Sequence, residues 1–150
     1  DNFIEYSDYT KNWLWKTFSK IDIVQKNSNL VIGILGLSYK ENTNSIKNSP
    51  SIKLISKIKN FNIKTHDPEA IVNLPRKIER KKTIHDCIIG TDILIICTPW
   101  KQYYDITIDD LKKKMRGKTI IDPYRIIVGK FSRHDNFICY SLGRKTLNIT

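Results

Sequence analysis

Residues 30–54, LVIGILGLSYKENTNSIKNSPSIKL, decide the fold. They begin with the apolar, β-branched run 30–35, which is typical of a strand buried on both faces of a sheet. A helix is predicted to start at Ser49 and Pro50, because serine caps the free N–H groups of a first turn and proline fits the next position. The polar loop 37–48 therefore follows the carboxyl end of a strand, where open α/β sheets bind their ligands.

The rest of the chain alternates apolar runs with polar or helical segments. The run 93–97 again predicts a strand covered on both faces, so the sheet should be parallel with helices on either side. Further strands are expected at 62–65, 83–85, 118–121 and 137–140. Further helices are expected from Glu69 to just before Pro75, as a single turn at 86–90, and at 106–115. The strand ends at Gly36, Asp67, Thr98 and Asp122 should gather at one edge of the sheet.

Ahead of this sheet, aromatic and aliphatic side chains recur at helical spacing between Tyr6 and Ile21. Such a stripe is more typical of packing in a core or between domains than of ligand stacking. Residues 22–29 are polar and predict a linker. The chain should therefore divide into a helix with its linker, 1–29, and an α/β domain, 30–150.

The composition is that of a folded domain with a substantial core. The 150 residues are 40% hydrophobic and 10% aromatic, which argues against disorder. The sequence contains no apolar run of membrane-spanning length and does not open on a signal-peptide pattern, so a cytoplasmic protein is expected. The formal net charge of +11 has two interpretations, a solvated surface in a lysine-rich chain or a surface for an anionic partner.

The three cysteines, Cys87, Cys97 and Cys139, show no CxxC spacing. An odd number without such spacing indicates neither a disulfide framework nor a zinc site. We therefore expect buried or half-buried free thiols and no bound metal.

The loop segment resembles a known family. Residues 36–49 are similar to G-L-A-F-K-x-x-T-x-D-x-R-x-S, which opens the C-terminal domain of the UDP-glucose/GDP-mannose dehydrogenase family. Five positions match outright, and Tyr39 stands where phenylalanine is usual. Ser45, Lys47 and Asn48 stand for the family's aspartate, arginine and glutamate. Thr98, Pro99 and Trp100 resemble a second family segment, and the similarity is nearly continuous from Ile32 to Arg144.

The resemblance implies a Rossmann-like α/β domain, preceded by a connecting helix, that binds the nucleotide part of a UDP-sugar. Family members oxidise the C6 alcohol of the sugar to a carboxylate with NAD, through a cysteine-linked intermediate. The cysteine motif G-F-G-G-x-C and the dinucleotide fingerprint G-x-G-x-x-G are both absent from this sequence. The chain is therefore expected to be the C-terminal part of such an enzyme, with no catalytic residue of its own. The N-terminal domain would hold most of the NAD, and the N-terminal and central domains would be partners of this chain. The connecting helix would form a homodimer.

The same resemblance, with the placement of charges, suggests the site residues. Tyr39, Lys40, Thr98 and Arg125 are expected to contact the UDP-sugar, and Lys47 the cofactor. An ammonium group on a loop that faces a cleft would neutralise the charge of a diphosphate.

Several alternatives stay open at this stage. Thr98 could equally form a structural turn, and Asp67 could hold a ribose hydroxyl or cap the helix expected after it. Arg125 lies one place after the usual family arginine, because Tyr124 occupies that position. For the whole chain, the rivals are a basic nucleic-acid-binding module, with basic segments at 76–82 and 112–118, and a dimerisation module whose cleft is degenerate.

Overall fold

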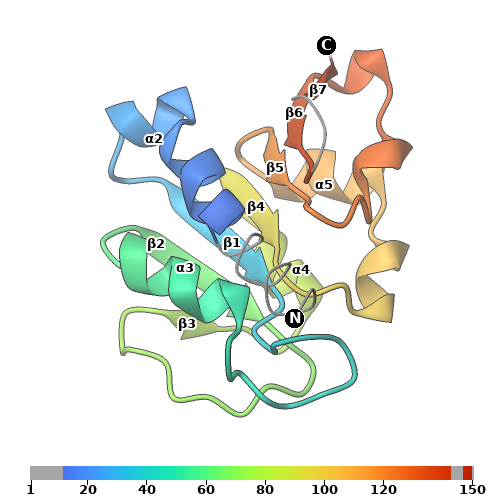
Figure 1. Cartoon of the computed structure of the whole chain (residues 1–150). Coiled ribbons are helices and arrows are strands. Elements are labelled where there is room, and N and C mark those ends of the chain that lie inside the picture. The colour runs from blue at the N-terminus through green and yellow to red at the C-terminus, as the bar shows by residue number, and fades with distance from the viewer. Residues whose placement is uncertain (1–11, 143–146, 150) are drawn as a thin grey trace.

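A single seven-stranded sheet forms the centre of the molecule in the computed structural model, which describes residues 12–142 and 147–149 (Figure 1). The strand order is β3-β2-β1-β4-β5-β6-β7. The first six strands pair in parallel, and β7 runs antiparallel to β6. The strands are β1 (Val31–Leu35), β2 (Asn62–His66), β3 (Glu79–Arg80), β4 (Ile93–Ile96), β5 (Thr119–Ile121), β6 (Phe137–Tyr140) and β7 (Leu147–Ile149).

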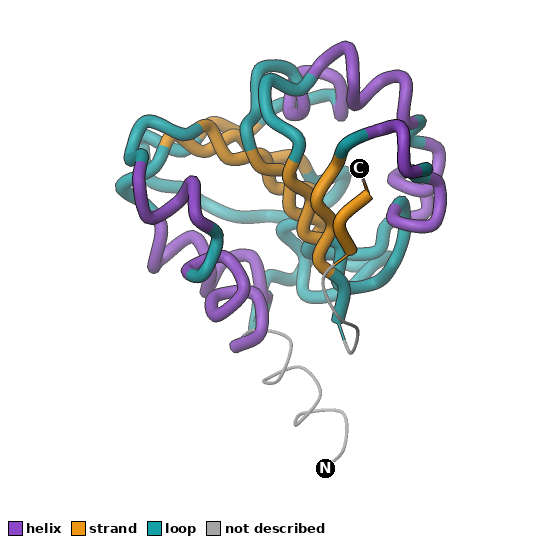
Figure 2. Tube along the Cα trace, turned by 90° about the horizontal axis from the view of Figure 1, so that it is seen from above, coloured by secondary structure: helices purple, strands orange, loops and turns teal. Residues whose placement is uncertain are grey.

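Helices lie on both sides of this sheet (Figure 2), which confirms the predicted Rossmann-like α/β class. The described part of the first helix covers residues 12–19. The others are α2 (Asp22–Lys26), α3 (Pro50–Ile58), α4 (Ile84–Ile88) and α5 (Ile108–Lys114), with short 3-10 helices η1 (Lys101–Asp105), η2 (Val128–Lys130) and η3 (Arg133–Asp135). Within the described ranges, every helix is too short or too polar to cross a bilayer.

Each face of the sheet carries its own core. On one face the first helix and α3 pack against β1 and β4 through side chains such as Phe18, Leu54 and Ile95. On the other face α4 and α5 pack through side chains such as Ile88 and Leu111. Because both faces are covered, β1 and β4 are apolar at successive positions, as the sequence predicts.

The start of α3 follows the sequence prediction. Ser49 is the N-cap, and its hydroxyl oxygen accepts a hydrogen bond from the N–H of Ile52 at 3.4 Å, with Pro50 at the first helical position. The same hydroxyl donates to the carbonyl of Leu37 at 2.7 Å. The cap therefore also fixes the helix to the beginning of the loop after β1.

The aromatic stripe packs as expected where the structure describes it. Leu14, Phe18 and Ile21 are buried against the sheet, and Trp13 is half-buried. Tyr6 and Tyr9 lie outside the described residues. This part of the stripe is therefore core of the α/β domain itself. This agrees with the prediction that the stripe packs in a core or between domains and does not stack on a ligand.

Four local predictions are wrong. The expected strand at 83–85 is the start of α4, because the Thr83 hydroxyl caps that helix by accepting the N–H of Asp86 at 3.0 Å. The third strand is Glu79–Arg80, inside the basic segment 76–82, where the sequence predicts no strand. The polar segment 22–29, predicted as a linker, contains α2. The structure also has β7, where the sequence predicts no element.

The fourth error concerns the short helix expected after β2. The segment that follows Asp67 forms a bend and loop instead. Its first two N–H groups, of Glu69 and Ala70, donate to the Asp67 carboxylate at 2.8 and 2.7 Å. The carboxylate thus stabilises a tight turn that no helix continues.

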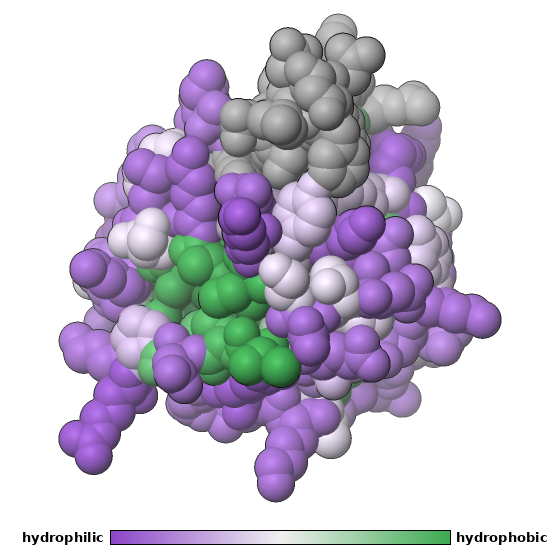
Figure 3. Space-filling view, turned by 60° about the horizontal axis from the view of Figure 1, so that its bottom comes forward, coloured by the Kyte–Doolittle hydropathy of each residue, from purple (hydrophilic) through white to green (hydrophobic). Residues whose placement is uncertain are grey.

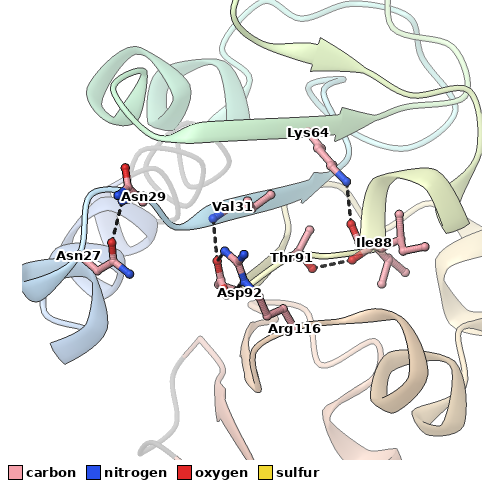
Figure 4. A network of polar contacts seen from close by, with 9 residues as sticks. Asn27, Asn29, Val31, Lys64, Ile88, Thr91, Asp92 and Arg116 are labelled. Carbon is pink, nitrogen blue, oxygen red and sulfur yellow. Dashed lines mark hydrogen bonds and ion pairs between the residues drawn. The ribbon is translucent and has the colours of Figure 1, made fainter.

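At the amino ends of the strands, Asp92 holds three elements together (Figure 4). Its carboxylate accepts the N–H of Val31 at 2.8 Å and two guanidinium bonds from Arg116, at 2.7 and 2.5 Å. The Arg116 hydrogen bond, opposed by partial burial, lowers the pKa of Asp92 below its usual range. This network connects β1, β4 and the segment before β5 at the edge opposite the loop 37–48.

Candidate functional site

The carboxyl ends of β2, β1, β4 and β5 lie side by side, as the parallel pairing requires. The backbone continues the pairing beyond the strands, since Gly36 N–H donates to the His66 carbonyl and Cys97 N–H to the Leu35 carbonyl, both at 2.8 Å. The predicted gathering of strand ends at one edge is therefore confirmed. We call this edge the rim; it comprises the loop 37–48 and the segments 66–70, 97–100 and 122–128.

Asp67 is the centre of the rim. Its side chain is buried, with 5% exposed, and its two carboxylate oxygens accept six hydrogen bonds. The donors are Leu37 N–H (2.7 Å), Ser38 N–H (2.8 Å), Ser38 Oγ (3.1 Å), Glu69 N–H (2.8 Å), Ala70 N–H (2.7 Å) and Trp100 Nε1 (3.1 Å). One carboxylate thus connects the segments that follow β1, β2 and β4.

These contacts decide the role of Asp67. Burial by itself would raise the pKa of Asp67, but the backbone N–H groups of Ser38, Glu69, Leu37 and Ala70 outweigh burial and lower it. The carboxylate therefore stays ionised at neutral pH, and its oxygens are occupied by hydrogen-bond donors of the protein. A ribose hydroxyl would have to displace one of these donors. The contacts therefore favour the capping role over the ribose role, although Asp67 caps a turn and not the expected helix.

Thr98 lies directly beneath the loop 37–48. It is fully buried, and its hydroxyl donates to the carbonyl of Ser38 at 2.8 Å. Its close neighbour Gly36 has a φ of +103°. The structure thus places Thr98 next to the loop expected to bind the ligand. The Thr98 hydroxyl donates its hydrogen bond to that loop.

The loop 37–48 is closed by its own hydrogen bonds. Tyr39 N–H donates to the Ser45 carbonyl at 2.7 Å, and the Ser45 hydroxyl accepts the N–H of Lys47 at 3.3 Å. A serine at this position therefore makes the kind of local turn contact that aspartate also makes. Asn48 adopts a left-handed conformation, with φ of +62°, which asparagine tolerates better than most residues.

Three expected ligand residues lie on the surface of the rim. Lys40 and Lys47 are exposed on the closed loop, and Arg125 is exposed after β5. Tyr39 is half-buried beside Lys40. Topology brings these side chains to the same edge, because β1 and β5 both flank β4.

The turn that carries Arg125 is built on Asp122. The buried Asp122 carboxylate accepts three backbone N–H groups, of Ile126, Ile127 and Val128, at 2.8 to 2.9 Å. Burial raises the pKa of Asp122, and these three donors oppose the rise. Arg125 itself has a left-handed φ of +56°, and its N–H donates to the Asp122 carbonyl at 3.1 Å. Arg125 is therefore exposed at the tip of a turn whose backbone the Asp122 carboxylate fixes.

A polar cleft of about 550 Å³ opens beside the loop, lined by Asn42, Thr43, Asn44 and Glu69. Ile71 N–H donates to the Asn44 carbonyl at 3.0 Å and holds the two walls together. Amide, hydroxyl and carboxylate groups suit ligand hydroxyls, whereas the Glu69 carboxylate disfavours phosphate. The cationic side chains and the polar cleft are thus distinct parts of one rim.

The same side of the molecule also carries apolar surface. Figure 3 shows an apolar patch framed by hydrophilic residues on the face where the loops after β1 and β2 lie. Ile71, in the loop after β2, is 73% exposed. A contiguous apolar patch rimmed by polar residues is a feature of interaction surfaces, whereas a single exposed apolar side chain is not.

Sequence reasoning missed several residues that build the rim. Arg80 donates to the carbonyls of Ala70 and Asp67 at 2.6 and 2.9 Å and so closes the turn from β3. His66 Nδ1 and the Tyr103 hydroxyl lie 2.9 Å apart beneath it. Burial lowers the pKa of His66, so its imidazole is held neutral in the core, although the Asp67 charge opposes the shift. No sequence motif marks these contacts, since they join residues far apart in the chain.

The cysteines are unsuited to nucleophilic catalysis. Cys87, Cys97 and Cys139 are all buried and free, as expected. Burial raises the pKa of Cys87 and of Cys139 to about 12 and shifts that of Cys97 in the same direction. Thiolates are therefore scarce at neutral pH. Across the described residues, no three His, Cys, Asp or Glu side chains are grouped to hold a metal ion.

Many cations of the two basic segments are used within the fold. In the first segment Arg80 binds the Asp67 turn, and Lys81 pairs with Glu79. In the second, Arg116 pairs with Asp92. Lys112 also pairs with Asp135, and Lys118 donates to the carbonyl of Asp135. These contacts disfavour a continuous basic surface for nucleic acid.

Together, the fold and the rim define a class of protein: a Rossmann-like α/β domain whose exposed cations and polar cleft suit an anionic ligand that carries hydroxyl groups. The profile of the UDP-glucose/GDP-mannose dehydrogenase family, UDP binding domain, matches residues 33–129. The chain belongs to this family. The resemblance that the loop and the Thr98 segment suggested is thereby confirmed.

Relatives with known names agree with this assignment. UDP-N-acetyl-D-mannosamine dehydrogenase of Pyrococcus horikoshii is 30% identical over 120 residues, which are 76% of this chain and 26% of that protein. UDP-glucose 6-dehydrogenase of Rickettsia typhi is 26% identical over 121 residues, 76% of this chain and 28% of that protein. The chain thus spans under a third of the length of these relatives.

Solved structures show the same fold. The structure of UDP-D-ManNAc dehydrogenase from Pyrococcus horikoshii superimposes with a TM-score of 0.67 at 28% identity, covering 92% of this chain and 31% of that one. The NDP-N-acetyl-D-galactosaminuronic acid dehydrogenase from Methanosarcina mazei gives a TM-score of 0.72 at 18% identity, covering 93% and 29%. At that identity the second likeness concerns the fold alone.

Proposed function

We propose that this chain is the substrate-binding part of an NAD-dependent nucleotide-sugar 6-dehydrogenase, an enzyme that oxidises the C6 alcohol of a UDP-sugar to a carboxylate. In this proposal residues 30–150 form the UDP-sugar-binding domain, and residues 1–29 end a connecting helix and its linker. The family match and the dehydrogenases among the relatives support this function. The bound ligand would be the nucleotide diphosphate with its sugar.

The observation that carries the proposal is the placement of Lys40. The loop that presents Lys40 is closed on itself and fixed to the protein at residues 37–38, while the side chain is exposed. An ammonium group held in this way neutralises a diphosphate without ordering a mobile loop on binding. We assign Lys40 and Arg125 to the diphosphate and Tyr39 to the adjacent part of the ligand. Thr98 supports the ligand loop through the Ser38 carbonyl.

Residues 12–142, which the structure describes, lack the features of a standard NAD site. A dinucleotide fold uses a glycine-rich turn and an acidic residue after the second strand. Here the first turn is a polar loop, and Asp67 is buried under six donors. We therefore propose that the N-terminal domain of the full-length protein holds most of the NAD, which accepts the hydride, and that Lys47 reaches toward it from this side.

Partners follow from the same proposal. The exposed Ile71 and the apolar patch of Figure 3 support contact with the other domains of the enzyme on this side. A homodimer through the connecting helix is also proposed, with Trp13 at its surface, since this indole is only half-buried. Light scattering on Trp13→Lys tests the dimer: an unchanged mass would contradict it. A cytoplasmic location stays a prediction.

Titration of UDP by calorimetry tests the function. Lys40→Ala should weaken UDP binding by about tenfold, the effect of one lost charge-assisted hydrogen bond. Lys53→Ala is the matched control, because Lys53 is equally exposed but lies on α3. Equal affinity of wild type and Lys40→Ala would remove the role of Lys40. A wild-type chain that does not bind UDP would instead favour the dimerisation module with a degenerate cleft.

A further inference from the structure

The contacts of Asp67 divide into two sets that face different parts of the rim. Oxygen Oδ2 accepts Leu37 N–H, Ser38 N–H and Trp100 Nε1, whereas Oδ1 accepts Ser38 Oγ and the N–H groups of Glu69 and Ala70. The first set fixes the start of the loop 37–48 to the segment after β4. The second fixes the turn after β2. We name this arrangement the Asp67 clasp.

We propose that Asp67 is a positioning residue for ligand binding: it holds the loop 37–48 in the shape that presents Lys40 to the diphosphate. This inference rests on the proposed function. Lys40 follows Ser38 by two residues, so the direction in which its side chain leaves the loop depends on the backbone that Asp67 fixes. The nearby polar cleft depends on the same turn, since Glu69 is one of its walls.

The clasp needs a carboxylate rather than any polar side chain. Every group around it is a donor: four backbone N–H groups, one hydroxyl and one indole N–H. An asparagine offers one acceptor oxygen and replaces the other by an NH₂ group, which would face donors. Either the loop contacts of Leu37 and Ser38 or the turn contacts of Glu69 and Ala70 would then be lost.

Other anchors of the loop do not replace the clasp. The Thr98 hydroxyl and the Ser49 hydroxyl donate to the carbonyls of Ser38 and Leu37, so they fix acceptors of the same two residues. In the described structure, the clasp is what accepts the N–H groups of residues 37 and 38. Its loss would leave two buried donors unpaired, and the backbone would have to move to satisfy them.

The structure also provides a matched control. Asp92 is a second largely buried carboxylate, 7% exposed against 5% for Asp67, and it too accepts a backbone N–H and further side-chain donors. It lies at the opposite edge of the sheet, away from the rim (Figure 4). Asp67→Asn and Asp92→Asn should therefore both lower stability, but only the first should affect the ligand.

The test is UDP titration of the wild-type chain and both variants at a temperature where all three are folded. We expect Asp67→Asn to weaken UDP binding at least tenfold and Asp92→Asn to change it less than twofold. Hydrogen exchange supplies a second readout: the amides of residues 39–48 should exchange faster in Asp67→Asn only. The indole N–H resonance of Trp100 should also shift in that variant, because its acceptor is altered.

The outcomes separate the two proposals. If wild type binds UDP and Asp67→Asn binds it equally well, positioning by Asp67 is wrong and the proposed function stands. Equal weakening in both variants would show a general effect of stability and would also overturn the inference. A wild-type chain without UDP affinity would overturn the proposed function, and the positioning role with it. Trp100→Phe, which removes one donor and replaces the indole by a smaller aromatic ring, should give an intermediate loss, and a loss as large as that of Asp67→Asn would contradict the shared role of the six donors.

Discussion

Gly36 lies so close to Thr98 that a Cβ atom at residue 36 would be 2.4 Å from the Thr98 Cβ and 2.6 Å from its backbone nitrogen. The φ of Gly36 is +103°, a conformation that side-chain-bearing residues rarely adopt. Both constraints arise where β1 leaves the sheet for the loop 37–48. The glycine is therefore required by the contact between β1 and the segment after β4.

Gly36→Ala should lower the free energy of unfolding by about 2 kcal/mol or more, since backbone strain and overpacking each cost about 1–3 kcal/mol. Urea denaturation followed by fluorescence measures the change. Gly129→Ala is the control, because a Cβ there would meet no atom within 4 Å. It should change stability by less than about 0.5 kcal/mol. A neutral Gly36→Ala would contradict the close approach of the two segments.

Acid should weaken the rim through Asp67. Its pKa is lower in the folded protein than its ordinary value of 3.8, because the backbone donors outweigh burial, so the unfolded chain binds the proton more tightly. The stabilisation is therefore complete above the ordinary value and is lost as the pH falls through the lowered pKa. The difference in stability between wild type and Asp67→Asn should shrink from pH 7 to pH 3. Urea denaturation at both values measures it, and a constant difference would contradict the shift.

The cysteines should resist modification in the native protein. All three are buried, and the raised pKa of Cys87 and Cys139, about 12, leaves little thiolate at pH 8. Reaction with a disulfide reagent should be at least about a hundredfold slower than in denaturant, where three thiols per chain become reactive. One thiol that reacts rapidly without denaturant would show that a cysteine is accessible and would reopen the question of a nucleophile.

Arg80 should contribute to stability rather than to binding of nucleic acid. Arg80→Ala removes two hydrogen bonds to the carbonyls of Ala70 and Asp67 and should cost about 1–2 kcal/mol in chemical denaturation. Arg76→Ala, at an exposed position of the same basic segment, should cost less than about 0.5 kcal/mol. Neither variant should change binding to DNA or RNA, measured by fluorescence anisotropy at low salt. Tight binding by wild type that Arg80→Ala abolishes would contradict this role.

The fold was predictable where local signals and burial agree. The continuous, β-branched apolar runs of β1 and β4 are typical of strands covered on both faces, and Ser49 with Pro50 marks the start of α3. The short elements were not predictable. Thr83 caps a helix of five residues that the sequence does not separate from a strand, and Glu79–Arg80 is extended only because it pairs with β2. Their structure is set by tertiary contacts.

The candidate site was predictable in its location but not in its internal structure. The loop after β1 could be placed at the carboxyl edge, and Lys40 and Lys47 are exposed there. The clasp could not be foreseen, because Asp67 meets Ser38 and Trp100 only after three strands have paired. In sequence, an aspartate before proline is compatible with a ligand residue and with a turn residue. The hydrogen-bond donors that surround its carboxylate in the structure decide between the two roles.

The sheet ends at β3, a strand of only two residues, Glu79 and Arg80. Such a border offers another polypeptide very few free backbone groups, and both side chains are charged and exposed. A second molecule therefore has little opportunity to extend the sheet from this side, and the protein is protected there against strand-to-strand aggregation.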